Sequence, residues 1–161
     1  MVLLVVALLA ACSDDADTSC EPEGFASGEA DVLGAPLGPF ARAAVIITPA
    51  GASGAQLAIV LDEADGTCGQ PGRDGRRLVV AFCVTPTSGT YEITSGLRCG
   101  SETAATQVSA LLEDADGTDR GSAIGTLTLT HAGGCVRGSY EMMIAGATLA
   151  GELDAVVCAP E

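Results

Sequence analysis

The chain has 161 residues, a net charge of −14 and only 3% aromatic residues, and its seven basic residues are all arginine. A surface this acidic repels nucleic acid and anionic headgroups, whose binding depends on Lys and Arg, and a chain without lysine has no Walker-type phosphate loop. The length fits one domain, which must have an aliphatic core.

The chain opens with the apolar run VLLVVALLAA, from Val2 to Ala11, which stops at Cys12. This run is too short to span a bilayer, which needs ~20 helical residues, but it matches the apolar core of a secretory signal. The stretch Leu9-Ala10-Ala11-Cys12 resembles the lipobox of bacterial lipoproteins. The resemblance implies that residues 1–11 are a helical signal peptide and that Cys12 carries the lipid. Because Ser13 is not the Asp that retains lipoproteins in the inner membrane, it also implies the outer membrane of the cell envelope. The alternatives are a non-lipidated signal or a short buried helix.

The segment after the lipobox is rich in acids, Pro and Gly and poor in large apolar residues. Such a composition cannot bury enough surface to offset its ordering entropy. It predicts a lipid-anchored flexible tether over residues 12–28, followed by one folded domain over residues 29–161.

Eight short apolar runs follow, separated by turn signals of Gly, Pro and Asp. This pattern predicts an all-β domain, an antiparallel β-sandwich or a flattened barrel of about eight strands. A parallel α/β fold would need amphipathic helices between the strands, and only the run 106–112 could be read as helical. The expected strands are 42–48, 55–61, 78–84, 90–94, 106–112, 123–130, 136–144 and 149–157.

The last two runs predict a hairpin. A type II′ turn with Gly146-Ala147 at its centre places Ala145 opposite Thr148. One face of the pair, from Val136 to Ile144 at alternate positions, is then apolar or glycine, which supports the choice of faces. The same register places Cys135 directly opposite Cys158, within the Cα range of a disulfide.

Seven cysteines are present, at positions 12, 20, 68, 83, 99, 135 and 158. Lipidation of Cys12 would leave six, which can form three disulfides in an oxidising compartment. The hairpin register favours Cys135–Cys158. A second hairpin, between 78–84 and 90–97, would bring Cys99 near Cys68, which favours Cys68–Cys99 and leaves Cys20–Cys83.

Two acidic heptapeptides nearly repeat each other, LDEADGT at 61–67 and LEDADGT at 112–118. Carboxylates at short spacing suit calcium, so the candidate ligands are Asp62, Glu63, Asp65, Asp114, Asp116 and Asp119. The EF-hand spacing is absent, because counting twelve positions from Asp114 ends on Gly125. The Asp-Gly dipeptides therefore favour exposed β-turns, with calcium as the alternative.

The single histidine, His131, would have to serve any Ser-His-Asp hydrolase, but no G-x-S-x-G motif accompanies it. Its neighbours Ala132-Gly133-Gly134 predict a surface loop. The sequence thus predicts a non-catalytic envelope lipoprotein without a cofactor, similar to other lipoproteins of GC-rich bacteria. Its expected partners are the membrane, through the lipid, and an envelope ligand or protein, with no nucleic acid. The alternatives are a small secreted hydrolase and a calcium-dependent adhesion or binding module.

Overall fold

The computed structural model describes residues 24–47, 57–64, 75–131 and 134–158. The regular elements of these residues are all strands, and none of the described residues belongs to a helix that could cross a membrane. The expected signal helix and residues 12–23 of the expected tether lie outside the described residues. The strands are β1 (Phe25–Ala26), β2 (Ala30–Val32), β3 (Ala35–Leu37), β4 (Arg42–Ile47), β5 (Leu57–Asp62), β6 (Arg77–Phe82), β7 (Gly89–Ile93), β8 (Gln107–Glu113), β9 (Asp119–His131), β10 (Cys135–Ile144) and β11 (Ala147–Val157).

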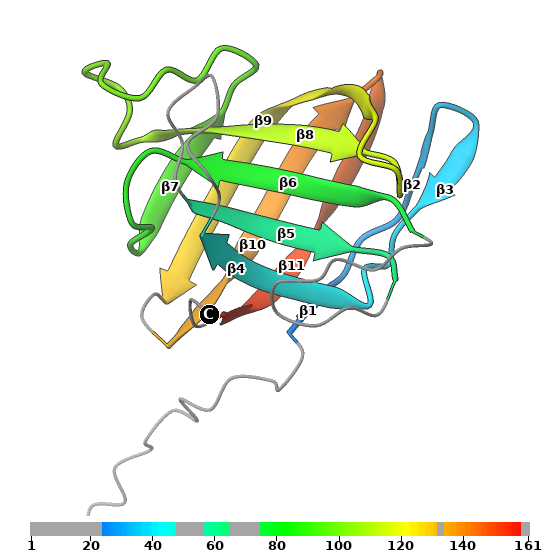
Figure 1. Cartoon of the computed structure of the whole chain (residues 1–161), viewed down its shortest axis with the longest axis horizontal. Helices are drawn as coiled ribbons and strands as arrows, with labels where there is room; N and C mark the ends of the chain where they lie inside the picture. The colour runs from blue at the N-terminus through cyan, green and yellow to red at the C-terminus, as the bar shows by residue number, and fades with distance from the viewer. Residues whose placement is uncertain (1–23, 48–56, 65–74, 132–133, 159–161) are drawn as a thin grey trace, which may run out of the picture.

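Strands β4 to β11 close into a mixed β-barrel (Figure 1). The sheet runs β11-β10-β9-β7-β8-β6-β5-β4, and it closes where β11 pairs in parallel with β4. The first part of β9 pairs with β8, whereas the part from Gly125 onward pairs with β7. The all-β prediction is confirmed, with each expected run forming one strand. The antiparallel sandwich is wrong, because the closing pair joins strands far apart in sequence and local patterns do not show such contacts.

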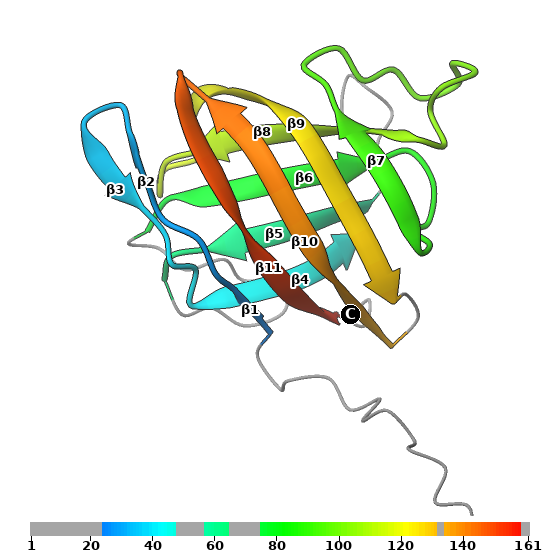
Figure 2. The ribbon, with the colours of Figure 1, turned by 180° about the vertical axis from the view of Figure 1, so that it is seen from behind.

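The barrel is flattened, since β9, β10 and β11 cross obliquely over β4, β5, β6 and β8 (Figure 2). Inward-facing aliphatic side chains fill the space between these two groups of strands, as in other small barrels. Phe82 and Tyr91 pack edge to face there, with ring centroids 5.5 Å apart. The largest side chains with less than 2% exposure are Phe82, Leu37, Ile59, Leu61, Leu78, Ile93, Leu112, Leu127, Leu129, Met142, Ile144 and Leu149.

The β10–β11 hairpin has the expected faces but a different register. Ile144 pairs with Ala147, so the turn residues are Ala145 and Gly146, and Cys135 faces Val156 instead of Cys158. Both turn residues have positive φ, 50° and 85°, which is the type I′ turn and not the expected type II′. The shift keeps each side chain on its face, because the pairing moves by two positions and the side-chain period is two.

The N-terminal strands lie beside the barrel and contribute Ala26, Val32 and Leu37 to the buried core. The short strand β1 extends the sheet beyond β11, while β2 and β3 form a separate hairpin (Figure 1). Part of the expected tether 12–28 is therefore folded. This segment approaches β11 closely, since a Cβ on Gly151 would lie 2.1 Å from the carbonyl oxygen of Ser27.

Candidate functional site

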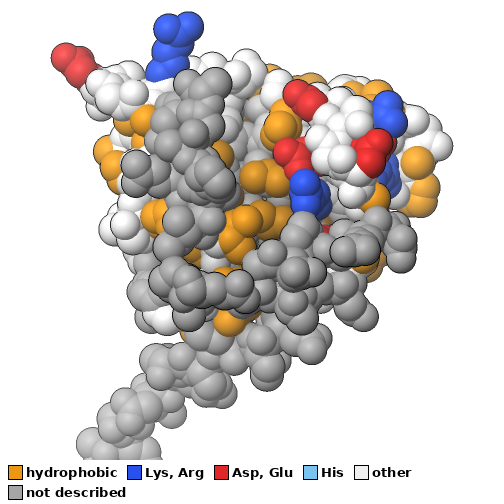
Figure 3. Space-filling model, in the orientation of Figure 1, with side chains coloured by type: hydrophobic (Ala, Val, Ile, Leu, Met, Phe, Trp, Pro, Cys, Tyr) orange, Lys and Arg blue, Asp and Glu red, His pale blue; other side chains and the backbone are white. Residues whose placement is uncertain are grey.

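Charged side chains of both signs gather toward one end of a barrel face (Figure 3). The strand register places Asp62 of β5 opposite Arg77 of β6, and Arg77 opposite Glu113 of β8. Their alternating signs form one row across the three strands, in which Asp62 is only 3% exposed and Arg77 Nε donates to Glu113 Oε2 at 2.6 Å. Both acidic heptapeptides begin here, because each starts at the end of a strand.

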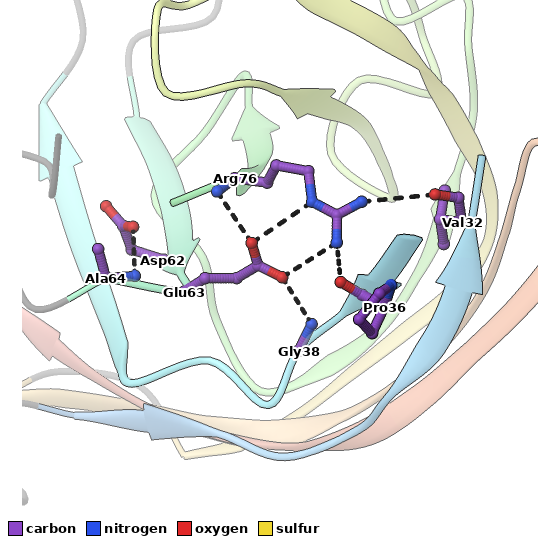
Figure 4. Close-up of polar contacts among 7 residues, drawn as sticks. All are labelled: Val32, Pro36, Gly38, Asp62, Glu63, Ala64 and Arg76. Atoms are coloured by element: carbon purple, nitrogen blue, oxygen red, sulfur yellow. Dashed lines mark hydrogen bonds and ion pairs between the residues drawn. The ribbon is translucent and has the colours of Figure 1, made fainter. Parts of the chain in front are cut away.

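Glu63 and Arg76 form the densest polar cluster at this end (Figure 4). Glu63 accepts from the backbone amides of Gly38 and Arg76, each at 2.9 Å, while its carboxylate pairs with Arg76 Nη2 at 3.3 Å. The Arg76 guanidinium also donates to the carbonyl oxygens of Val32 and Pro36. The cluster therefore ties the β2–β3 hairpin to the ends of β5 and β6.

The second heptapeptide forms an exposed turn between β8 and β9, as the sequence predicts. Gly117 has φ +81°, and its amide donates to the Asp114 carbonyl at 2.8 Å. Hydrogen bonds from Thr118 lower the pKa of Asp116. Arg120 donates to Asp114 Oδ2, which raises the pKa of this arginine. The matching dipeptide of the first copy, Asp65-Gly66, lies outside the described residues.

The third residue of each acidic heptapeptide forms an ion pair with an arginine. Glu63 in the first and Asp114 in the second each pair with an arginine on the returning side of the turn, Arg76 and Arg120. Each carboxylate is thus paired with a cation, and the pair links the end of one strand to the start of the next. This ion-pairing role was not predicted from the sequence, although an arginine follows each acidic heptapeptide and indicates a possible partner.

The calcium candidates do not converge in the described part of the chain. Asp62 Oδ1 accepts from the Ala64 amide at 3.1 Å, and Asp119 Oδ1 accepts from the Gly121 amide at 2.7 Å. No three acidic, histidine or cysteine side chains among the described residues are placed to hold a metal ion.

His131 is the last residue of β9 and pairs with Arg137, so its backbone lies in a strand and not in the expected surface loop. The two tyrosines, which sequence reasoning did not single out, have structural contacts. Burial raises the pKa of Tyr140 to about 12, and its hydroxyl donates to the Ser27 carbonyl. The Tyr91 hydroxyl donates to the Thr87 carbonyl and accepts from the Thr87 amide, both at 2.9 Å.

The disulfides differ from the expected pairing. Cys83 is bonded to Cys99, so the predicted Cys68–Cys99 and Cys20–Cys83 bonds are wrong. The reason is that β7 pairs with β8 and β9 and not with β6. The C-terminal ends of β6 and β7 both reach Val108, which brings the segments after these strands together.

Cys135 and Cys158 are each disulfide-bonded as well. The register argument for joining them to each other is wrong, because Val156 occupies the position opposite Cys135. Cys12, Cys20 and Cys68 lie outside the described residues.

The fold and these contacts define the class of molecule as a closed, mixed β-barrel with disulfides and with carboxylates engaged in internal contacts. No protein-family model, curated protein or solved structure gives a significant match to this chain.

Proposed function

We propose that this chain is a lipid-anchored protein of the bacterial cell envelope, attached through Cys12 to the outer membrane, with a binding or structural role. The observation that supports a non-catalytic role is that the acidic side chains at the barrel end are engaged in ion pairs. Glu63, Glu113 and Asp114 each bond an arginine. Carboxylates held in this way are poor general acids or bases, which need an open position next to a substrate.

The disulfides support an exported location. Cys83, Cys99, Cys135 and Cys158 are all oxidised, and structural disulfides persist in oxidising compartments. The packed interior further supports binding at the outer surface or the loops, because large side chains already occupy the inside of the barrel.

Lipid attachment is tested by growing a bacterium that produces the full chain on an alkyne-tagged fatty acid. We expect label on the wild type and on Cys20→Ser, which serves as the control, and none on Cys12→Ser. The unlabelled variant should also leave the membrane fraction, since several acyl chains are needed for firm anchoring. Label that persists in Cys12→Ser, or an unlabelled wild type, would overturn the anchor.

The non-catalytic role is tested with a panel of ester, phosphoester and glycoside substrates. We expect no turnover above that of the His131→Ala variant. Turnover by the wild type that His131→Ala abolishes would instead identify a hydrolase.

A further inference from the structure

Arg42 is a buried cation at the start of β4. Its side chain is 6% exposed, and its Nε is buried without a hydrogen-bond partner in the described part of the chain. Four other arginines each bond a carboxylate, namely Arg76, Arg77, Arg120 and Arg137. Asp62 lies opposite Arg42 in the strand register, but no ion pair joins these two described residues.

The guanidinium of Arg42 instead points at a sulfur. Its Nη2 lies 3.9 Å from Cys158 Sγ, in donor geometry. Cys158 is itself only 8% exposed and is disulfide-bonded. A buried positive charge next to a cysteine sulfur favours the thiolate over the neutral thiol. Arg42 is thus placed to stabilise the anion that forms when this disulfide is cleaved.

Cys158 also lies beside the seam of the barrel, which we define as the pairing of β4 with β11. The seam contains two register pairs, Val156 with Ala44 and Val157 with Val45. The amide of Cys158 then donates to the Val45 carbonyl at 3.0 Å. Any change at Cys158 therefore acts directly beside the two register pairs that close the barrel.

We propose that the disulfide of Cys158 is a redox-sensitive link at the barrel seam, and that Arg42 promotes its cleavage by thiols. The attacking thiolate forms a new S–S bond with the sulfur of the cysteine bonded to Cys158. The original S–S bond breaks, and its electron pair leaves on Cys158 Sγ beside the guanidinium. A second thiol resolves the mixed disulfide, so two reductant thiols are oxidised and two cysteines are reduced.

The test equilibrates the purified full chain in glutathione buffers, traps free thiols by alkylation and maps them by mass spectrometry. Arg42→Met removes the charge and keeps an unbranched side chain. We expect about tenfold more reducing buffer to be needed to half-reduce the Cys158 disulfide in this variant. The control is Arg98→Met, which removes an exposed charge next to Cys99, and it should leave both disulfides unchanged. An unchanged Cys158 midpoint in Arg42→Met would overturn the proposal.

A second arm does not depend on whether Arg42→Met folds. In partly reduced wild type, Cys158 should be alkylated at lower pH than free cysteine, and Arg42→Lys should preserve this behaviour. Amide exchange at Cys158, whose amide donates to the Val45 carbonyl, should accelerate on reduction of this bond, while exchange at Leu112 in β8 stays unchanged. Alkylation of Cys158 only at the higher pH of free cysteine, or a Cys158 amide unaffected by reduction, would refute the redox-sensitive link.

Discussion

Glu63→Ala should lower the stability of the barrel more than its partly exposed position suggests. The carboxylate accepts two backbone amides, those of Gly38 and Arg76, at 2.9 Å each. Hydrogen bonds to a charged group contribute about 1.5–3 kcal/mol each, whereas a partly exposed ion pair adds less than about 1 kcal/mol. Because such terms are not additive, we expect a loss of about 3 kcal/mol in the free energy of unfolding. That loss corresponds to a fall in Tm of roughly 6–12 °C.

Urea denaturation with the disulfides intact measures this loss directly. Glu63→Gln keeps one acceptor oxygen and should lose about half as much. The matched control is Asp114→Ala, which removes the equivalent acid of the second heptapeptide from a pair whose arginine side chain is 51% exposed. This control should change the midpoint much less. If Glu63→Ala and Asp114→Ala shift the midpoint equally, the hairpin-bracing role assigned to Glu63 is wrong.

The remaining predictions concern burial and close approach. Since burial raises the pKa of Tyr140 to about 12, above an unfolded value of ~10, its contribution to stability is complete below pH ~10 and is lost as the pH rises toward 12. Tyr140→Phe should flatten the decline seen in alkaline urea titrations, and an unchanged decline would contradict this. Gly125→Ala should destabilise the fold by at least about 2 kcal/mol more than Gly121→Ala, as judged by urea midpoints. Both glycines have positive φ, but only at Gly125 would a Cβ meet a backbone oxygen, at 2.2 Å; equal losses would refute the clash. Peroxide should oxidise Met143, 47% exposed, well before Met142, 2% exposed, and tandem mass spectrometry that finds the reverse order would overturn the assigned faces.

The strands were predictable from sequence because their signals are local. The run TQVSALL, for example, alternates in burial from Gln107 to Leu112 as a half-buried strand should. Barrel closure was not predictable, since nothing within β4 or β11 specifies that these two strands pair. The register of the last hairpin depended on whether Ala145 accepts positive φ, which is uncommon for a residue with a Cβ.

The candidate site was predictable in composition but not in role. The acidic heptapeptides were visible, and Asp-Gly predicted the turn that Asp116 and Gly117 form. The partners of their carboxylates come from strands and hairpins brought together by the fold, as with the Gly38 amide on Glu63. The Arg42–Cys158 contact likewise joins the start of the first barrel strand, β4, to the residue after the last, β11, so no local sequence pattern predicts it.

Pairing of β4 with β11 has a consequence for the order in which the chain can fold. Closing a loop between Ala44 and Val156 requires a large loss of chain entropy before any contact at that junction forms, and such topologies fold slowly. The strand β4 gains its second neighbour only when β11 is in place, which leaves one edge of β4 unpaired until the last strand joins the barrel. Exposed edges of this kind pair with other chains. A folding barrel of this topology is therefore exposed to aggregation until β11 closes it.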